Sequence, residues 1–190
     1  DGSAEMLSHA FSRKYEAEVE SVLFLQQDMR SFELYGTVGA ITCCLDSLNY
    51  LLGEGELDTC FSLVHNYLDP DGLFLFDVNS PYKFENIYGS NAYVLEDESD
   101  EGGAIFCGWQ NEYDEESGLC DFYLTLFEEN EDGSYFREDE HQTERCYKRE
   151  ELVSALEGAG FELIGIFSDF EFSKINDTDE RWYIAARAKK

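Results

Sequence analysis

The sequence predicts an α/β fold with a mainly parallel sheet and an antiparallel insertion. Short, mainly apolar runs such as 41–45 and 73–76 are typical of strands that are buried on both faces. A segment with helical spacing lies between two such runs, which is the order of a crossover connection between parallel strands. Aromatic, partly alternating runs over 104–145 are separated by acidic turns and predict an antiparallel meander.

The N-terminal part predicts a capped helix followed by a buried strand. Ser3 can cap a helix over about 4–17, in which apolar residues return every three or four positions. Glu5 suits the positive N-terminal end of that helix. The apolar run 22–25 predicts a strand, and the polar segment 26–30 follows it directly. This strand therefore delivers polar groups at its C-terminal end.

The next unit has the order strand, helix, strand. The run 41–45 ends at Asp46, and the run 73–76 leads into a second polar segment. Between them, four apolar residues share one helix face: Leu57, Phe61, Val64 and Leu68. The sequence Asp-Pro-Asp-Gly at 69–72 predicts a type I turn. We expect helices to cover both faces of the resulting parallel sheet.

Polar side chains follow each of these strands at its C-terminal end. A parallel sheet gathers these ends along one edge, where open α/β folds have their ligand crevice. The polar set expected near this edge is Asp28, Asp46, Asn49, Asp77 and Asn79. Such a set suits a ligand with hydroxyls, amines or a positive charge.

The C-terminal part predicts one more helix and two strands. Strands of the meander are expected over 104–113, 119–128 and about 135–145. Helical spacing then returns at Leu152, Val153, Leu156 and Ala159. The runs 161–167 and 182–188 predict the last two strands of the main sheet.

Composition and charge exclude several classes of partner. The net charge of −29, from 42 acidic and 13 basic residues, repels nucleic acids and anionic membranes. No apolar run approaches the roughly 18 residues of a membrane span, and no signal peptide is evident. The six cysteines lack the spacing of a zinc site. We therefore expect an acidic cytoplasmic protein without a bound metal.

The ordered segments resemble a known enzyme family. FLQQDMRSFEL, AITCCLDSLNYLL, LDPDGLFLFDVNS and EELVSALEGAGFELIGIF, closed by RWYIAARAK, resemble the small class I methyltransferases that use S-adenosylmethionine. The resemblance covers nearly the whole chain, and QDMR, DSLNYL and LFLFDVNS point to one bacterial branch. It implies a Rossmann-like fold and transfer of a methyl group from S-adenosylmethionine to a small-molecule acceptor. Both a monomer and a homodimer stay open.

The same resemblance assigns the candidate site residues. Asp1 stands where the family has an acid that binds the ribose hydroxyls of the cofactor. Asp28 and Met29 stand where the family has the two residues that contact the adenine. Leu45 and Asp46 stand beside the methionine part of the cofactor. The candidates on the acceptor side are Asp46, Asn49, Tyr50 and His141. No catalytic residue is required, because the cofactor supplies the reactive group and the protein aligns the reactants.

The resemblance also implies a division of the chain and one departure from the family. It implies a cofactor-binding core over 1–80, an antiparallel lid over 81–147 and a C-terminal completion of the core over 148–190. The family's glycine-rich loop has no counterpart, because Gly53 and Gly55 lie in a helix connection. We therefore expect an N-terminally incomplete fold.

That departure keeps two other hypotheses open. A chain without the loop can be a catalytically inactive binding or interaction module derived from this fold. It can also be another dinucleotide enzyme, such as an NAD-dependent one. The second hypothesis is weakened because the phosphate-binding glycines of such enzymes are missing.

Overall fold

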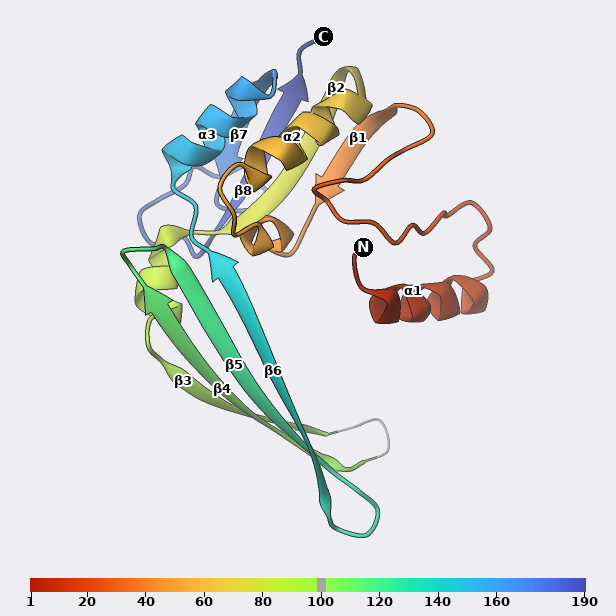
Figure 1. Cartoon of the computed structure of the whole chain (residues 1–190), viewed down its shortest axis with the longest axis vertical. Coiled ribbons are helices and arrows are strands. Elements are labelled where there is room, and N and C mark those ends of the chain that lie inside the picture. The colour runs from red at the N-terminus through yellow and green to blue at the C-terminus, as the bar shows by residue number, and fades with distance from the viewer. Residues whose placement is uncertain (99–101) are drawn as a thin grey trace.

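The computed structural model describes residues 1–98 and 102–190. Figure 1 shows three parts: a sheet with two helices packed on it, a long antiparallel sheet that projects away from it, and an N-terminal helix that stands apart. No helix in the described ranges is long and apolar enough to cross a membrane.

The main sheet is mixed. Its strand order is β1 (Val38–Cys43), β2 (Leu68–Asn79), β8 (Arg181–Ala188) and β7 (Phe161–Phe167). β1 is parallel to β2, whereas β8 is antiparallel to both β2 and β7. The prediction of a mainly parallel sheet is therefore confirmed only in part: β1, β2 and β7 point in the same direction, but β8 runs against them, so the sheet is mixed. The cause is that β7 and β8 follow each other and pair directly, so β8 reverses direction between β7 and β2.

The strand predicted over 22–25 is not formed. A strand needs partners for its backbone groups, and the described residues offer this segment only Asp1. The Asp1 amino group donates to the Leu25 carbonyl at 3.3 Å, and the Gln27 amide donates to the Asp1 carbonyl at 3.0 Å. These two bonds have the pattern of a parallel pair reduced to one residue. They hold the QDMR segment beside Asp1.

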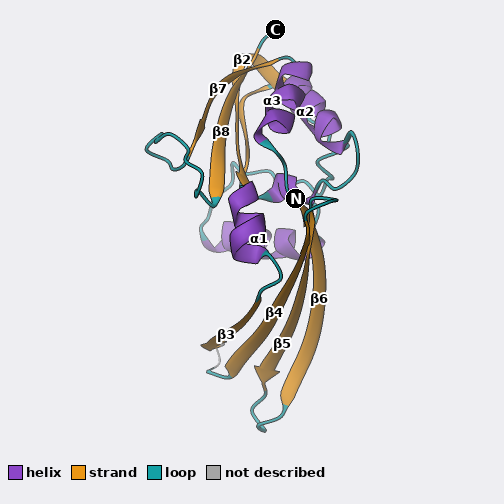
Figure 2. Ribbon diagram, turned by 90° about the vertical axis from the view of Figure 1, so that its left-hand side faces the viewer, coloured by secondary structure: helices purple, strands orange, loops and turns teal. Residues whose placement is uncertain are grey.

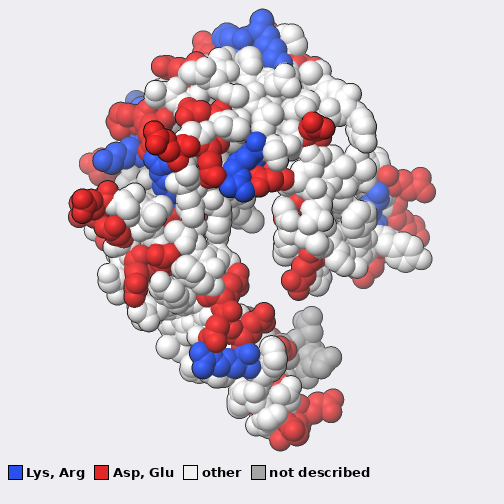
Figure 3. Space-filling view, viewed as in Figure 1, with Lys and Arg blue, Asp and Glu red and all other residues white. Residues whose placement is uncertain are grey.

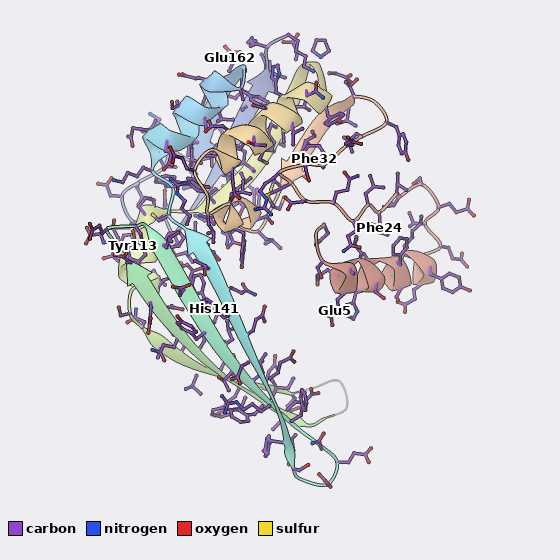
Figure 4. All side chains as sticks on the ribbon, in the orientation of Figure 1. Glu5, Phe24, Phe32, Tyr113, His141 and Glu162 are labelled. Atoms are coloured by element: carbon purple, nitrogen blue, oxygen red, sulfur yellow. The ribbon has the colours of Figure 1, made fainter. Side chains whose placement is uncertain are left out.

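The predicted N-terminal helix is confirmed as α1 (Ala4–Glu16). Ser3 caps it, because its Oγ accepts from the Met6 amide at 3.1 Å. None of its residues is buried. The Phe11 ring meets the Phe24 ring edge-on at 5.0 Å, and Figure 4 shows Phe24 beside the helix. α1 is thus attached through the neighbouring segment and not through the main sheet.

Two helices cover one face of the main sheet. α2 (Glu56–Tyr67) and α3 (Arg149–Gly158) lie on the same side, as Figure 2 shows. The predicted apolar face of α2 is confirmed for Leu57, Phe61 and Val64, whereas Leu68 begins β2. Phe61 packs edge-on against Phe74 at 5.5 Å. Leu75 faces the other way along β2 and stays 39% exposed. The expectation of helices on both faces is therefore wrong for the described residues.

The predicted type I turn at 69–72 is also wrong. Asp71 has φ of 60°, which does not occur in a type I turn. The segment belongs to β2, where Leu68 pairs with Val38 and Leu73 pairs with Ala40. The residues between are extra on the β2 side and form a bulge in the parallel pair.

The second sheet is antiparallel and contains the three predicted runs. Its strands are β3 (Ala92–Glu98), β4 (Ala104–Asp114), β5 (Leu119–Glu129) and β6 (Tyr135–Arg145), in that order. β3 was not expected. A π-helical turn, η2 (Lys83–Tyr88), joins this sheet to β2 and buries Phe84 and Tyr88. Tyr88 packs edge-on against Phe122 at 4.8 Å, so this end of the sheet has its own small core.

The main core gives a first testable prediction. We expect Phe61→Ala to lower the free energy of unfolding by about 3–5 kcal/mol, because the fully buried ring contacts both Phe74 and Phe76. Urea unfolding followed by circular dichroism measures this change. Phe11→Ala is the matched control, since that ring is 52% exposed and should cost far less. Equal losses in both variants would contradict the assignment of the core.

Candidate active site

A cleft of about 870 Å³ lies beside the edge of β1 that pairs with no other described strand. Three predicted cofactor residues line it: Asp1, Asp28 and Met29. Cys43, Cys44 and Ser47, at and after the end of β1, also contribute to the wall. Figure 3 shows that this side of the molecule is hollowed between the sheet, β6 and the N-terminal segment. The volume lies within the range of small-molecule sites.

Asp28 is an ionised hydrogen-bond acceptor at the surface of this cleft. The Arg30 side chain donates from Nε to Oδ1 at 2.9 Å and from Nη2 to Oδ2 at 2.5 Å. These bonds, together with one from the Arg30 amide, lower the pKa of Asp28 to about 2. Arg30 is held in turn by Glu56 at 2.7 Å. Asp28 therefore stays a carboxylate at neutral pH.

Asp1 presents a second carboxylate to the cleft. Its Oδ1 accepts from the Ser3 amide at 2.8 Å, next to the cap of α1. Oδ2 has no hydrogen-bond partner among the described residues. Asp1 and Asp28 come from segments that the two backbone bonds at Leu25 and Gln27 hold together. The cleft thus offers two acid groups from different parts of the chain.

The loop 44–47 follows β1 and has an unusual backbone. Leu45 and Asp46 are consecutive and have φ of 58° and 52°, a left-handed conformation that is unfavourable for residues with a Cβ. The Asp77 carboxylate holds this turn by accepting from the Leu45 amide at 2.8 Å and from the Asp46 amide at 3.0 Å. Arg181 donates to Asp46 Oδ2 at 2.7 Å and also to Asp77. One arginine therefore binds both carboxylates.

Asn79, at the end of β2, connects this loop to the second sheet. Its Nδ2 lies 2.9 Å from Asp46 Oδ2 and 2.9 Å from Glu144 Oε2. Its amide donates to Asn49 Oδ1 at 3.0 Å, and Asn49 donates to the Arg145 carbonyl at 2.8 Å. The sheet edge thus brings together four of the five predicted polar residues: Asp46, Asn49, Asp77 and Asn79. Asp28 belongs to the cleft instead.

Tyr50 and His141 lie on opposite faces of β6. Tyr50 lines the cleft, and its hydroxyl donates to Gln142 Oε1 at 2.5 Å. His141 is next in sequence to Gln142, so its side chain is on the other face of the strand. There it contacts Asp121 at 2.9 Å and stacks on Tyr123, and Figure 4 shows it midway along β6. The structure does not bring His141 to Asp46.

Leu45 also lies outside the cleft. It lines an apolar pocket of about 380 Å³ together with Phe170 and Phe172. Asp46, its neighbour, turns into the polar cluster described above. Within the described ranges, no three His, Cys, Asp or Glu side chains are arranged to hold a metal ion.

Comparisons with known proteins identify the family. No family model matches the chain. A relative from Geobacillus sp. (strain WCH70), named "Putative methyltransferase", is 33% identical over 98% of this chain and 73% of its own length. The chain belongs to the S-adenosylmethionine-dependent methyltransferase family. "Putative methyltransferase YqeM" of Bacillus subtilis (strain 168) is also 33% identical, over 100% of this chain and 74% of its own length.

Solved structures agree with this assignment and with the α/β fold. A S-adenosylmethionine-dependent methyltransferase from Clostridium acetobutylicum ATCC 824 has a TM-score of 0.89 and 28% identity, and the match covers 100% of this chain and 74% of that one. Streptomyces venezuelae DesVI has a TM-score of 0.78 at 16% identity, which supports the fold alone. The cofactor of the Clostridium methyltransferase, and of the family, is S-adenosylmethionine.

Sequence reasoning missed several polar residues of the methyltransferase site. They are Lys83, Tyr88, Glu144 and Arg181. Glu144 belongs to a polar run on β6 and gives no signal of burial, yet it is only 5% exposed. Its burial depends on pairing with Cys120 across the sheet and on contact with Asn79 at the end of β2. No local pattern contains this long-range information.

Glu144 titrates near neutral pH. Burial raises the pKa of Glu144 to about 7, and nearby Asp46 raises it further, whereas the hydrogen bond from Asn79 and the charges of Lys83 and Arg181 lower it. Burial also lowers the pKa of Lys83, whose Nζ donates to Asn79 Oδ1 at 3.0 Å. Within the described residues, Glu144 forms no ion pair. The methyltransferase thus has, beside the loop 44–47, a buried carboxylate that Lys83 and Arg181 influence without forming an ion pair with it.

Proposed function

We propose that this methyltransferase holds S-adenosylmethionine in the cleft and transfers its methyl group to a small molecule bound between the loop 44–47 and β6. The supporting observation is the pair of carboxylates, Asp1 and Asp28, in a cleft that extends to Ser47 and Tyr50. A ribose offers two hydroxyl donors and an adenine offers an exocyclic amine, and each suits a carboxylate acceptor.

Each residue has a role in binding or alignment. Asp1 would accept from the ribose hydroxyls through its free Oδ2. Asp28 would accept from the adenine amine, and Met29 would pack against the ring. The backbone at Leu45 and Asp46 would fix the end of the cleft next to the reacting groups. When bound, the cofactor supplies an electrophilic methyl group on sulfur, so the protein needs only to align the acceptor and exclude water.

We further propose that segment 81–147 acts as the lid over the acceptor. Three core side chains at the sheet edge, Asn49, Tyr50 and Asn79, are among those that contact the lid. Their partners are Arg145, Gln142 and Glu144, all on β6. β6 is therefore the strand of the lid that faces both the cleft and the polar cluster.

Calorimetric titration with S-adenosylhomocysteine tests the proposed cofactor site. We expect micromolar binding by the wild-type chain. Asp28→Asn should bind about tenfold more weakly, because it loses one charge-assisted hydrogen bond to the ligand. Asp139→Asn is the matched control, because Asp139 forms a similar exposed pair with Arg137 at 2.8 Å, away from the cleft. Equal affinity of both variants for the ligand would contradict the role of Asp28.

A further inference from the structure

Glu144 is a buried carboxylate that forms no direct ion pair within the described residues. Three acids face the cluster at the sheet edge: Asp46, Asp77 and Glu144. The only two cations there within the described residues are Arg181, which binds Asp46 and Asp77, and Lys83, which binds the neutral Asn79. Both cations lower the pKa of Glu144 without pairing with it, and with all three acids ionised the cluster keeps one negative charge, which favours an added cation.

Tyr50 connects Glu144 to the cofactor cleft. It lines the cleft, is 43% exposed, and donates its hydroxyl to Gln142 at 2.5 Å. The same hydroxyl interacts with Glu144, and burial followed by the nearby charges of Glu144 and Asp46 raises the pKa of Tyr50 to about 12. Tyr50 therefore stays protonated. A positively charged group in the cleft beside Tyr50 would be attracted electrostatically to the Glu144 carboxylate.

We propose that the methyl acceptor is a protonated amine, whose ammonium group binds to Tyr50 and passes one proton to Glu144. This proposal rests on the proposed function. The ammonium donates to the Tyr50 oxygen, and the Tyr50 hydroxyl turns from Gln142 to the Glu144 carboxylate and passes its proton there, while Tyr50 takes the ammonium proton in exchange. The freed nitrogen lone pair then forms a bond to the methyl carbon, while the carbon–sulfur bond of the cofactor breaks and its electrons stay on sulfur. The products are a methylated ammonium ion and S-adenosylhomocysteine.

Titratable and charged groups on several surrounding elements interact with Glu144. They are Tyr50 at the wall of the cleft, Asp46 on the loop 44–47, Lys83 and Tyr88 on η2, Cys120 on β5 and Arg181 on β8. Tyr88 and Cys120 are neutral at physiological pH, because burial raises the pKa of both thiol and phenol. Glu144 is thus the group that changes charge near pH 7.

A pair of probes of equal shape tests the proposal. The complex of the full chain with S-adenosylhomocysteine is titrated with benzylammonium and with benzyl alcohol at pH 8. We expect benzylammonium to bind at least about tenfold more tightly. Glu144→Gln should remove this preference and leave the affinity for S-adenosylhomocysteine unchanged. Glu138→Gln is the matched control, since Glu138 lies on the same face of β6 but is exposed.

The pH dependence separates an electrostatic role from a structural one. In the wild-type chain the affinity for benzylammonium should fall as the pH drops through about 7, because Glu144 becomes neutral. In Glu144→Gln this fall should be absent. Equal binding of the two probes, no binding of benzylammonium at millimolar concentration, or unchanged binding in Glu144→Gln would overturn the proposal. Failure of S-adenosylhomocysteine to bind the wild-type chain contradicts the proposed function itself.

Discussion

Replacing Asp77 with alanine is expected to lower the free energy of unfolding by about 3–5 kcal/mol. Its carboxylate is buried and accepts from the amides of Leu45 and Asp46 and from Arg181. The change removes the acceptor that holds two left-handed residues and leaves the Arg181 guanidinium with one carboxylate in place of two. Urea unfolding of the two proteins, followed by circular dichroism, measures the loss.

The affinity of the same variant for S-adenosylhomocysteine provides a second measurement. Cys44 and Ser47 line the cleft on either side of the strained pair, so a relaxed loop should weaken binding as well. Asp77→Asn keeps one side-chain oxygen and should lie between the wild type and Asp77→Ala in both measurements. Unfolding free energies of Asp77→Ala and the wild type that agree within about 0.5 kcal/mol would show that the loop does not depend on Asp77.

Replacing Asp1 with alanine is expected to weaken the binding of S-adenosylhomocysteine by about 100-fold. Two hydrogen bonds to a charged acceptor are together worth roughly 3 kcal/mol, and each 1.4 kcal/mol corresponds to a factor of ten. Calorimetric titration measures the change. Because Asp1 also accepts from the Ser3 amide at 2.8 Å, the helix content of the variant must be compared with that of the wild type.

Ser3→Ala separates the two roles of Asp1. It removes the cap of α1, which should cost about 1 kcal/mol of helix stability, but it keeps the Asp1 carboxylate. We expect its affinity for S-adenosylhomocysteine to stay within about twofold of the wild type. If Ser3→Ala binds as weakly as Asp1→Ala, the effect belongs to the helix and not to ribose recognition.

Local sequence patterns predicted most single elements of the fold. The four-three-four spacing of apolar residues located α2, and the run 161–167 matches β7 residue for residue. The predictions that failed concern partners distant in sequence. Whether 22–25 becomes a strand depends on a neighbouring strand, and the direction of β8 depends on its insertion between β2 and β7. A local sequence pattern contains no information about either of these long-range partners.

The site was predictable only where strand ends determine it. Asp46, Asn49, Asp77 and Asn79 meet because β1 and β2 are parallel and end at the same edge. The contribution of β6 was not predictable, because a shift of one residue exchanges the two faces of a strand. For that reason the sequence offered His141 as a candidate, whereas Gln142 and Glu144 face Tyr50 and Asn79.

A crystal structure of the chain with S-adenosylhomocysteine tests the central claim most directly. The account predicts the ligand in the 870 Å³ cleft, with its ribose hydroxyls within hydrogen-bonding distance of Asp1 and its adenine amine within that distance of Asp28. The sulfur atom should lie toward Ser47 and Tyr50. A ligand bound instead in the apolar pocket of Leu45, Phe170 and Phe172, with Asp1 and Asp28 uninvolved, would contradict it.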